Sequence, residues 1–398
     1  MKKKIKISFI EMIIIVAIPS MILSILTGAV IYSKLNKTGK VTSTNNQYVN
    51  QFINVYNELL TEYYEDLDEN ELVDAAINGM LSYAGDDYTI YMNEDATEAL
   101  NSQLEGTYEG IGIKITLDEK FNIVIVEVFQ DSPAEKAGLK INDIITSVNG
   151  ISVIEQPTEY VTNIIKASKE SKIKLEILRE ETKLDFEIER KTLIVPALTS
   201  SIKEVNNKKI GYIHLSTFNS TIDTQIETTL LSMEKDGIDS LILDVRGNTG
   251  GYLTNCTKII EMFLKKGTLM YTIKSKNSED HYYDETDTYR KYPIIVLING
   301  GSASASEILA TTLRDSYGAT IIGTKSYGKG KVQTTGTLND GTMIKYTSAK
   351  WYTPKGNCID EVGIIPDIKV ELSEKYVKNP IDENDDQLNK AIELLTKK

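Results

Sequence analysis

The stretch from Ile294 to Gln333 constrains the fold and the chemistry of this chain more than any other. It contains an apolar strand (IIVLI), a glycine turn (NGG), a serine-rich helix start (SASAS) and, after a second strand, a lysine between two glycines (GKG). This order places a candidate nucleophile, Ser304, at a helix N-terminus and a candidate base, Lys329, on a second turn 25 positions later. The chain has only two histidines, so a hydrolase of this sequence is not expected to use an imidazole base.

Neither histidine indicates a metal site. His214 lies in an expected strand and His281 in a polar loop, and neither accompanies other ligand-type residues at metal spacing. The two cysteines, Cys256 and Cys358, are too few and too far apart for a zinc site or a disulfide scaffold, although a single bridge between them stays open. No metal or cofactor is therefore expected.

Strands and helices alternate from residue 193 to the end, and this predicts an α/β core over residues 193–398. Continuous apolar runs such as LILDV and IIVLI are typical of a sheet that is covered on both faces. The expected strands are 208–218, 240–248, 293–300 and 319–326, and the expected helices are 221–237, 255–267, 303–318 and a short amphipathic one at 385–398.

Residues 106–192 have a different pattern, with short β-type runs bounded by Gly, Asn, Asp and Pro. Two helical pieces, 132–139 and 159–167, lie between these runs. Such a set of elements predicts a small β-barrel module. The expected strands are 111–117, 122–129, 143–150, 172–179 and 183–190.

Residues 35–105 are expected to be a polar tether followed by a helical region. Apolar side chains recur there at three- and four-residue spacing from Phe52 to Tyr64, which indicates an amphipathic helix. Asp68 or Asn70 can cap a following helix that closes at Gly85. The pattern fits a subdomain that packs on itself and a dimerisation arm equally well.

The N-terminal 34 residues are expected to form a cytoplasmic stub and a membrane anchor. Residues 12–33 carry no charge and are near the ~20 residues that cross a bilayer as a helix. A secretory signal peptide is the alternative, but no clear small-x-small cleavage site follows. The lysines on the two sides weakly favour a single-pass protein of the cell membrane with its body on the extracytoplasmic side. The net charge of −13 argues against a nucleic-acid partner.

The local sequence leaves the roles of the serines and lysines open. Ser304 and Glu307 form an S-x-x-E pattern, which is a common way to start a helix without any catalytic role. Ser302 and Ser306 compete with Ser304 as nucleophile. Lys329 works as a base only if burial lowers its pKa, and Lys331 is an equally visible alternative two positions later.

Two glycine-containing turns offer backbone N–H groups to a substrate. Residues 244–251 (DVRGNTGG) follow a buried strand, and their N–H groups together with that of Ala305 are candidates for an oxyanion hole, or the glycines serve the turn alone. Residues 108–113 (YEGIGI) precede a strand and are a candidate loop for a peptide's terminal carboxylate, with the peptide adding to the sheet as a strand.

Six motifs together resemble the C-terminal processing (tail-specific) serine peptidases, a family with a PDZ domain and a serine–lysine site. The motifs occur in the family's order and span about residues 90 to 370. They are YEGIGI, SPAEKAGLKINDIITSVNG, DVRGNTGGYL, NGGSASASEILA, GTKSYGKGKVQ, and KWYTPKG followed by GIIPDI.

The resemblance assigns roles that local spacing leaves open. It implies that Ser304 is the nucleophile, that Lys329 is the base and that Gln333 supports the lysine. It implies oxyanion donors at Gly250 and Ala305. The PDZ carboxylate loop that it implies consists of Gly110, Ile111, Gly112 and Ile113.

The chain departs from the family pattern at two positions. Thr249 stands where members often have proline, and this difference is expected to matter little. Lys166 stands where some members have arginine, and lysine lacks the bidentate fork of a guanidinium group.

The resemblance also implies the fold class: a crotonase-like α/β peptidase core with a PDZ module, an N-terminal helical region and one transmembrane helix. The expected function is that of a membrane-anchored serine endopeptidase that captures free apolar C-terminal tails of proteins, with a homodimer through the N-terminal helices as a further expectation. The alternatives are a catalytically inactive PDZ scaffold and an enzyme of the acyl-coenzyme A type.

Overall fold

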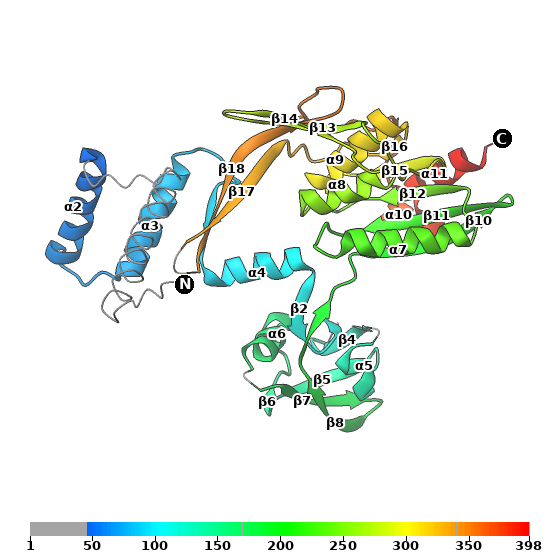
Figure 1. Ribbon diagram of the computed structural model, residues 1–398. Coiled ribbons are helices and arrows are strands. Elements are labelled where there is room, and N and C mark those ends of the chain that lie inside the picture. Colours follow the sequence, from blue (N-terminus) through cyan, green and yellow to red (C-terminus); the bar gives the residue numbers. More distant parts are fainter. Residues whose placement is uncertain (1–45, 119, 130, 169, 339–340, 398) are drawn as a thin grey trace, which may run out of the picture. The chain divides into compact units, whose positions relative to one another are not determined.

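The computed structural model describes residues 46–397 except 119, 130, 169 and 339–340. The chain divides into two compact units, one that ends at Ile77 and one that starts at Asn78. Each unit is described by itself (Figure 1).

The first unit contains helix α2 (Gln47–Glu62) and most of α3 (Glu69–Ser82). Asp68, one of the two expected caps, accepts hydrogen bonds from the N–H groups of Asn70 (2.8 Å) and Glu71 (3.0 Å) at the start of α3. The Tyr56 hydroxyl donates to Glu69 Oε1 at 2.7 Å and links the two helices. No residue of α2 or α3 is buried, so the apolar side of α2 faces outward.

The expected fold class requires one correction. No helix in the described part of the chain is long and apolar enough to cross a membrane, so the transmembrane helix of the expected fold class is not supported. The longest helix among the described residues, α2, has 16 residues and an amphipathic sequence, whereas a membrane-spanning helix needs ~20 mostly apolar residues. The apolar run at 12–33, on which the expectation rested, lies outside the described residues.

The second unit is built around a six-stranded sheet in the order β10-β11-β12-β15-β16-β19. Strands β10 and β11 pair antiparallel, and every later pair is parallel. The strands are β10 (Leu198–Val205), β11 (Lys208–Leu215), β12 (Ser240–Asp244), β15 (Ile294–Ile298), β16 (Thr320–Gly323) and β19 (Ile368–Lys369).

Both faces of this sheet are covered. Successive side chains of a strand point to opposite faces, so neighbouring residues of one strand pack against different layers. Leu241 and Leu243 of β12 pack into the core cluster that also contains residues of three helices, whereas Ile242 packs into the cluster that contains Leu388. Helices α7 (Ile222–Lys235), α8 (Leu253–Glu261) and α9 (Ala305–Thr312) therefore lie on one face, and α11 (Asp386–Thr396) lies on the other (Figure 1).

A second sheet carries part of the candidate site, and its order is β1-β18-β13-β14, with β17 also paired to β18. Strand β1, which is far upstream in the sequence, pairs antiparallel with β18. The strands are β1 (Ile90–Met92), β13 (Leu269–Ser275), β14 (Glu279–Tyr283), β17 (Lys331–Thr337) and β18 (Met343–Tyr352). Helix α4 (Glu94–Glu105) follows β1.

The small β module forms its own core around a sheet in the order β3-β4-β5-β7-β8, with a short strand β6 on β5. The chain enters this module through β2 (Thr107–Gly110) and leaves it through β9 (Lys191–Ile194), and these two strands pair antiparallel. Its other elements are β3 (Ile113–Leu117), β4 (Ile123–Val128), α5 (Pro133–Ala137), β5 (Ile144–Val148), β6 (Ile151–Ser152), α6 (Thr158–Ala167), β7 (Lys172–Arg179) and β8 (Thr182–Glu189).

The two cysteines are not bonded to each other. Cys256 is buried in α8, and Cys358 is partly buried in a loop near the end of β18.

Candidate active site

Three turns meet at one edge of the main sheet. They follow β12, β15 and β16, and the carboxyl ends of parallel strands lie at the same edge, where open α/β sheets bind their ligands. A cavity of about 330 Å³ lies there. Its lining includes Leu100, Gln103 and Leu104 of α4, Gly250, Gly251, Tyr252, Ser304, Ala305, Lys329, Lys331, Gln333, Lys345 and Trp351.

Ser304 sits at the N-cap of α9 with φ 57° and ψ −116°. A non-glycine residue rarely adopts this conformation, which costs on the order of 1–3 kcal/mol and is common where a side chain must be held in one direction at a functional site. Of the capping box that the S-x-x-E pattern predicts, the Glu307 half is present, because the Ser304 N–H donates to Glu307 Oε2 at 2.8 Å.

The other two serines of the SASAS run are engaged elsewhere. Ser302 donates its hydroxyl to the carbonyl oxygen of Val245 at 2.8 Å, and Ser306 donates to that of Asn248 at 2.7 Å. Both side chains are fully buried and fasten the helix start to the turn after β12. Among these three serines, Ser304 is the one that lines the cavity.

Glu307 is the residue whose importance the sequence did not reveal. Its carboxylate is fully buried and accepts four hydrogen bonds. The donors to Oε1 are the Ser326 hydroxyl (2.5 Å) and the Gly328 N–H (2.8 Å), and the donors to Oε2 are the N–H groups of Ser304 (2.8 Å) and Lys329 (2.9 Å). One oxygen therefore holds the backbone of the candidate nucleophile and of the candidate base within two hydrogen-bond lengths of each other.

A local signal for this role exists in the sequence. Glu307 is followed by Ile-Leu-Ala, and helix α9 is buried on all sides, so its carboxylate needs partners beyond its own helix. Burial raises the pKa of the Glu307 carboxyl, while the hydrogen bonds from Ser326, Lys329, Gly328 and Ser304 oppose that shift because they favour the ionised form.

Lys329 is held in a close-packed turn. A Cβ atom on Gly328 would come within 2.8 Å of the Gly363 nitrogen, and one on Gly330 within 2.6 Å of Asp360 Cβ, so only glycine fits on either side of the lysine. The Trp351 indole N–H donates to the Lys329 carbonyl oxygen at 2.9 Å.

Burial lowers the pKa of the Lys329 ammonium from its ordinary value, and the positive charge of Lys345 acts in the same direction. The negative charges of Asp86 and Glu307 oppose the shift. The environment of Lys331 shifts its pKa in the opposite direction. Its ammonium contacts Asp86 Oδ1 at 3.2 Å, and that hydrogen bond raises its pKa.

Gln333 lines the same cavity, but its observed hydrogen bond does not go to Lys329. Its side-chain amide donates to Thr347 Oγ1 at 3.3 Å. The Thr347 hydroxyl in turn donates to Asp86 Oδ2 at 2.6 Å, so Gln333 belongs to a network around Asp86.

The two expected oxyanion donors lie beside Ser304. A Cβ atom on Gly250 would come within 3.0 Å of Ser304 Cβ and 3.2 Å of the Ala305 nitrogen, and the φ of Gly250 is 106°. Only glycine fits there. In the present conformation the Gly250 N–H donates to Asn248 Oδ1 at 2.9 Å, so it is not free to bind an oxyanion.

The expected carboxylate loop lies in the small β module and lines a separate narrow groove of about 70 Å³. Gly110, Ile111, Gly112 and Ile113 form one wall of this groove, and Ile165 and Lys166 of α6 contribute to the other. None of the residues of this groove lines the cavity at Ser304, so the structure does not bring the two expected sites together.

The histidines take no part in the cavity. His214 Nε2 lies 3.3 Å from the carbonyl oxygen of Arg246, and His281 Nδ1 lies 2.9 Å from the hydroxyl of Thr272.

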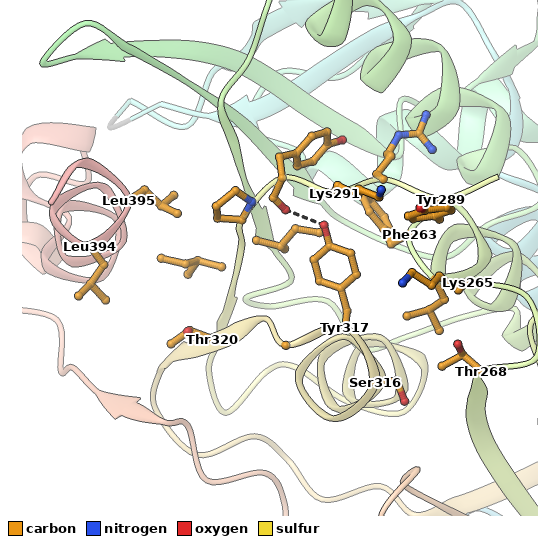
Figure 2. A pocket seen from close by; sticks show the side chains of 17 residues that line it. Phe263, Lys265, Thr268, Tyr289, Lys291, Ser316, Tyr317, Thr320, Leu394 and Leu395 are labelled. Atoms are coloured by element: carbon orange, nitrogen blue, oxygen red, sulfur yellow. Dashed lines mark hydrogen bonds between the residues drawn. The ribbon is translucent and has the colours of Figure 1, made fainter. Parts of the chain in front are cut away.

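A larger cavity of about 750 Å³ also contains serine and lysine residues, and their contacts differ from those of Ser304 and Lys329 (Figure 2). The hydroxyl of Ser316 donates to the Leu269 carbonyl oxygen at 2.8 Å. Lys265 and Lys291 are exposed, and their ammonium groups lie 5.5 and 4.9 Å from the centre of the Tyr289 ring.

Comparison with known proteins gives three family matches. Residues 209–370 match Peptidase family S41, residues 109–189 match the PDZ domain, and residues 24–96 match the Activating protease CtpB N-terminal domain.

Two similar curated proteins come from Bacillus subtilis (strain 168). The chain is 36% identical to the carboxy-terminal processing protease CtpB over 347 residues, which cover 86% of this chain and 72% of that protein. It is 34% identical to the carboxy-terminal processing protease CtpA over 382 residues, which cover 96% and 80%. Among solved structures, a putative S41 protease from Bacteroides fragilis NCTC 9343 shares the fold, with a TM-score of 0.56, 16% identity, and coverage of 84% of this chain and 98% of that one.

The first prediction concerns Glu307→Gln. An amide retains one acceptor oxygen and turns an N–H₂ group toward two donors, so we expect the free energy of unfolding to fall by about 3 kcal/mol. Because Ser304 and Lys329 lose their common anchor, we expect kcat/KM to fall about 100-fold. Urea denaturation and peptide cleavage measure the two effects.

The control for this prediction is Glu374→Gln, on an almost fully exposed side chain of helix α10 (Glu374–Lys378). It should change stability by less than about 0.5 kcal/mol. Native kcat/KM in Glu307→Gln would contradict the positioning role of the carboxylate.

Proposed function

Because this chain belongs to peptidase family S41 and is a carboxy-terminal processing serine protease with a PDZ domain, we propose that it cleaves peptide bonds with a Ser304–Lys329 dyad. Its substrates are peptides or proteins. We propose further that the PDZ domain selects substrates by their free apolar C-terminal tails.

The proposed reaction uses the neutral amine of Lys329 as general base. The amine takes the proton of the Ser304 hydroxyl while Oγ attacks the peptide carbonyl carbon, which gives a tetrahedral oxyanion. The ammonium then returns this proton to the leaving amine as the C–N bond breaks, and an acyl-enzyme remains. Lys329 then takes a proton from a water molecule that attacks the ester carbon, and it returns this proton to Ser304 Oγ as the C–O bond breaks and the acid product leaves.

The arrangement around Glu307 is the observation that carries this proposal. The same carboxylate oxygen holds the backbone N–H groups of Ser304 and Lys329, and both side chains line one cavity. Two features support the choice among neighbours. Ser302 and Ser306 donate to backbone carbonyl groups, and Lys331 is paired with Asp86.

The oxyanion donors in this proposal are the N–H groups of Ala305 and Gly250. Ala305 is the first residue of α9, where backbone N–H groups have no partner within the helix and the helix dipole favours negative charge. Gly250 contributes when its N–H exchanges Asn248 Oδ1 for the developing oxyanion. Gln333 supports Lys329 in this proposal through the Thr347–Asp86 network.

The proposed tail site is the groove between the loop 110–113 and α6. Backbone N–H groups of such a loop bind a carboxylate, and an extended peptide adds to the edge of β3. Ile113, Ile115 and Ile165 make the groove apolar, which suits an apolar last residue. The cationic Lys166 lies at the same groove.

The second prediction tests the dyad. We expect Ser304→Ala and Lys329→Ala each to lower kcat/KM at least about 1,000-fold, and Lys331→Ala to lower it far less. In the native chain kcat/KM should rise with pH through the pKa of Lys329, because only the neutral amine accepts a proton. Since burial lowers that pKa, the rise should occur below the ~10.4 of a free lysine. Cleavage of a fluorogenic peptide reports these values, and full activity of Ser304→Ala would refute the assignment.

The third prediction tests tail recognition. A Cβ atom on Gly112 would come within 2.2 Å of Ser132 Cβ, and the φ of Gly112 is 92°, so Gly112→Ala should distort the carboxylate loop. We expect this variant to raise KM about tenfold for an unstructured substrate with a free apolar C-terminus. The C-terminally amidated substrate should show the same high KM with the native chain and with Gly112→Ala. Gly150→Ala is the control, because its Cβ would meet open space at a similar positive φ. Equal cleavage of acid and amide by the native chain would remove the tail-reading part of the proposal.

The fourth prediction concerns self-association. We propose that the expected homodimer uses the outward apolar side of α2, where Phe52 is 49% and Val55 is 54% exposed. Sedimentation of the full chain should give the mass of a dimer, and Phe52→Glu should shift it toward the monomer because it places a charge in the contact. A monomer at micromolar concentration for the native chain would exclude the dimer.

A further inference from the structure

A short segment upstream of the PDZ domain reaches the candidate base. Residues 86–89 are the last part of the segment 83–89 that connects α3 to β1. The Lys329 ammonium nitrogen lies 4.7 Å from the centre of the Tyr88 ring, and that of Lys331 lies 5.4 Å from it. The Tyr88 hydroxyl lies 3.4 Å from that of Tyr327, which is two positions before Lys329, so the ring contacts the turn after β16 at two places.

The segment is fastened on both sides of Tyr88. Asp86 Oδ2 accepts from the hydroxyls of Thr347 (2.6 Å) and Thr89 (2.7 Å), and Asp86 Oδ1 accepts from Lys331 (3.2 Å). The Thr347 N–H donates to Thr89 Oγ1 at 3.2 Å. These contacts lower the pKa of Asp86 to about 2 against the opposing effect of its burial, so the carboxylate is ionised at neutral pH.

Strand β1 extends the attachment. It begins directly after Thr89 and pairs with β18, with Ile90 opposite Lys345. The backbone on both sides of Tyr88 is therefore held, by the hydrogen bonds of Asp86 and Thr89 and by the paired strand β1 that follows. A ring in such a place excludes water from the lysine beside it and limits the directions in which the amine can point.

We propose that Tyr88 is a positioning residue for Lys329: its ring shields the amine from water and directs it toward Ser304, so a segment from before the PDZ domain completes the active site. This inference rests on the proposed function, in which Lys329 is the base. Asp86 serves the same arrangement, because it binds Lys331 and keeps the second lysine away from the base.

Two effects of the ring on Lys329 oppose each other. A cation over an aromatic face is stabilised by about 0.5–2 kcal/mol, which favours the ammonium form. Exclusion of water disfavours the ammonium form by as much as several pKa units when burial is complete. The charged groups that act on Lys329 are Lys345 of β18, Asp86 and Glu307 of α9, and Lys331 of β17 lies near the same Tyr88 ring. Because burial is the largest cause of the lowered pKa, loss of the ring should raise that pKa.

The experiment compares Tyr88→Ala and Tyr88→Phe in the full chain, with Tyr83→Ala as the matched control, since Tyr83 is 95% exposed. The readout is kcat/KM for a fluorogenic peptide across pH. We expect Tyr88→Ala to move the pH at which kcat/KM rises upward by about one unit and to lower kcat/KM at pH 7 about tenfold or more. Tyr88→Phe should keep the native pH profile because the ring is retained, and Tyr83→Ala should behave as the native chain.

Three outcomes would overturn the proposal. A uniform loss of kcat/KM in Tyr88→Ala with an unchanged pH profile would show a merely structural role. A defect in Tyr88→Phe as large as that in Tyr88→Ala would assign the effect to the hydroxyl rather than the ring. Full activity of Lys329→Ala would show that Lys329 is not the base. This variant therefore separates failure of the proposed function from failure of the inference.

A second measurement is independent of catalysis. In the Ser304→Ala background, lysines carrying ¹³C-methyl groups are titrated by NMR, and the Lys329 signal is identified by its loss in Lys329→Arg. With Tyr88 present this signal should titrate below the exposed lysines, and with Tyr88→Ala it should move toward them. An identical titration in both chains would overturn the proposal even if Tyr88→Ala is too unstable for kinetics.

Discussion

The buried carboxylate of Glu307 is the interaction on which the site depends. An ionised carboxylate is expensive to remove from water unless hydrogen bonds replace its hydration, and Glu307 receives four of them. The donors belong to two separate turns, the start of α9 and the turn after β16. The need to satisfy one charge therefore brings together two pieces of backbone that the sheet alone would leave as independent loops.

The rest of the site adapts to this anchor. The unusual backbone conformation of Ser304 is tolerable because Glu307, the buried Ser302 and the buried Ser306 hold the turn on both sides. The absence of side chains at Gly250, Gly328 and Gly330 lets neighbouring backbone approach to within contact distance. Capping is compatible with the proposed catalytic role of Ser304, since the Glu307 side chain caps through the backbone N–H of Ser304 and not through its hydroxyl.

Much of the fold could be predicted because its signals are local. Apolar runs at β12 and β15 and the helical period of α7 are legible within ten to fifteen residues, and so are the glycine turns between them. The partners of the turns could not be predicted in this way. Glu307 was visible only as a cap, and the contacts of Asp86 and Tyr88 with the turn after β16 join residues more than 200 positions apart, which leave no periodic pattern. The membrane-spanning helix was inferred from the uncharged run at 12–33, which lies outside the described residues, and no described helix corresponds to it.

The long reach of the Asp86 contacts has a consequence for the order of biosynthesis. Asp86 is 245 positions before Lys331 and 261 before Thr347, with the whole PDZ domain between them. A ribosome has translated nearly the entire body before these partners exist together. Until then the Tyr88 ring is not fastened beside Lys329, so a partial chain lacks the surroundings that the proposed site needs. A chain that ends before Thr347 therefore lacks the network that holds Tyr88 beside Lys329.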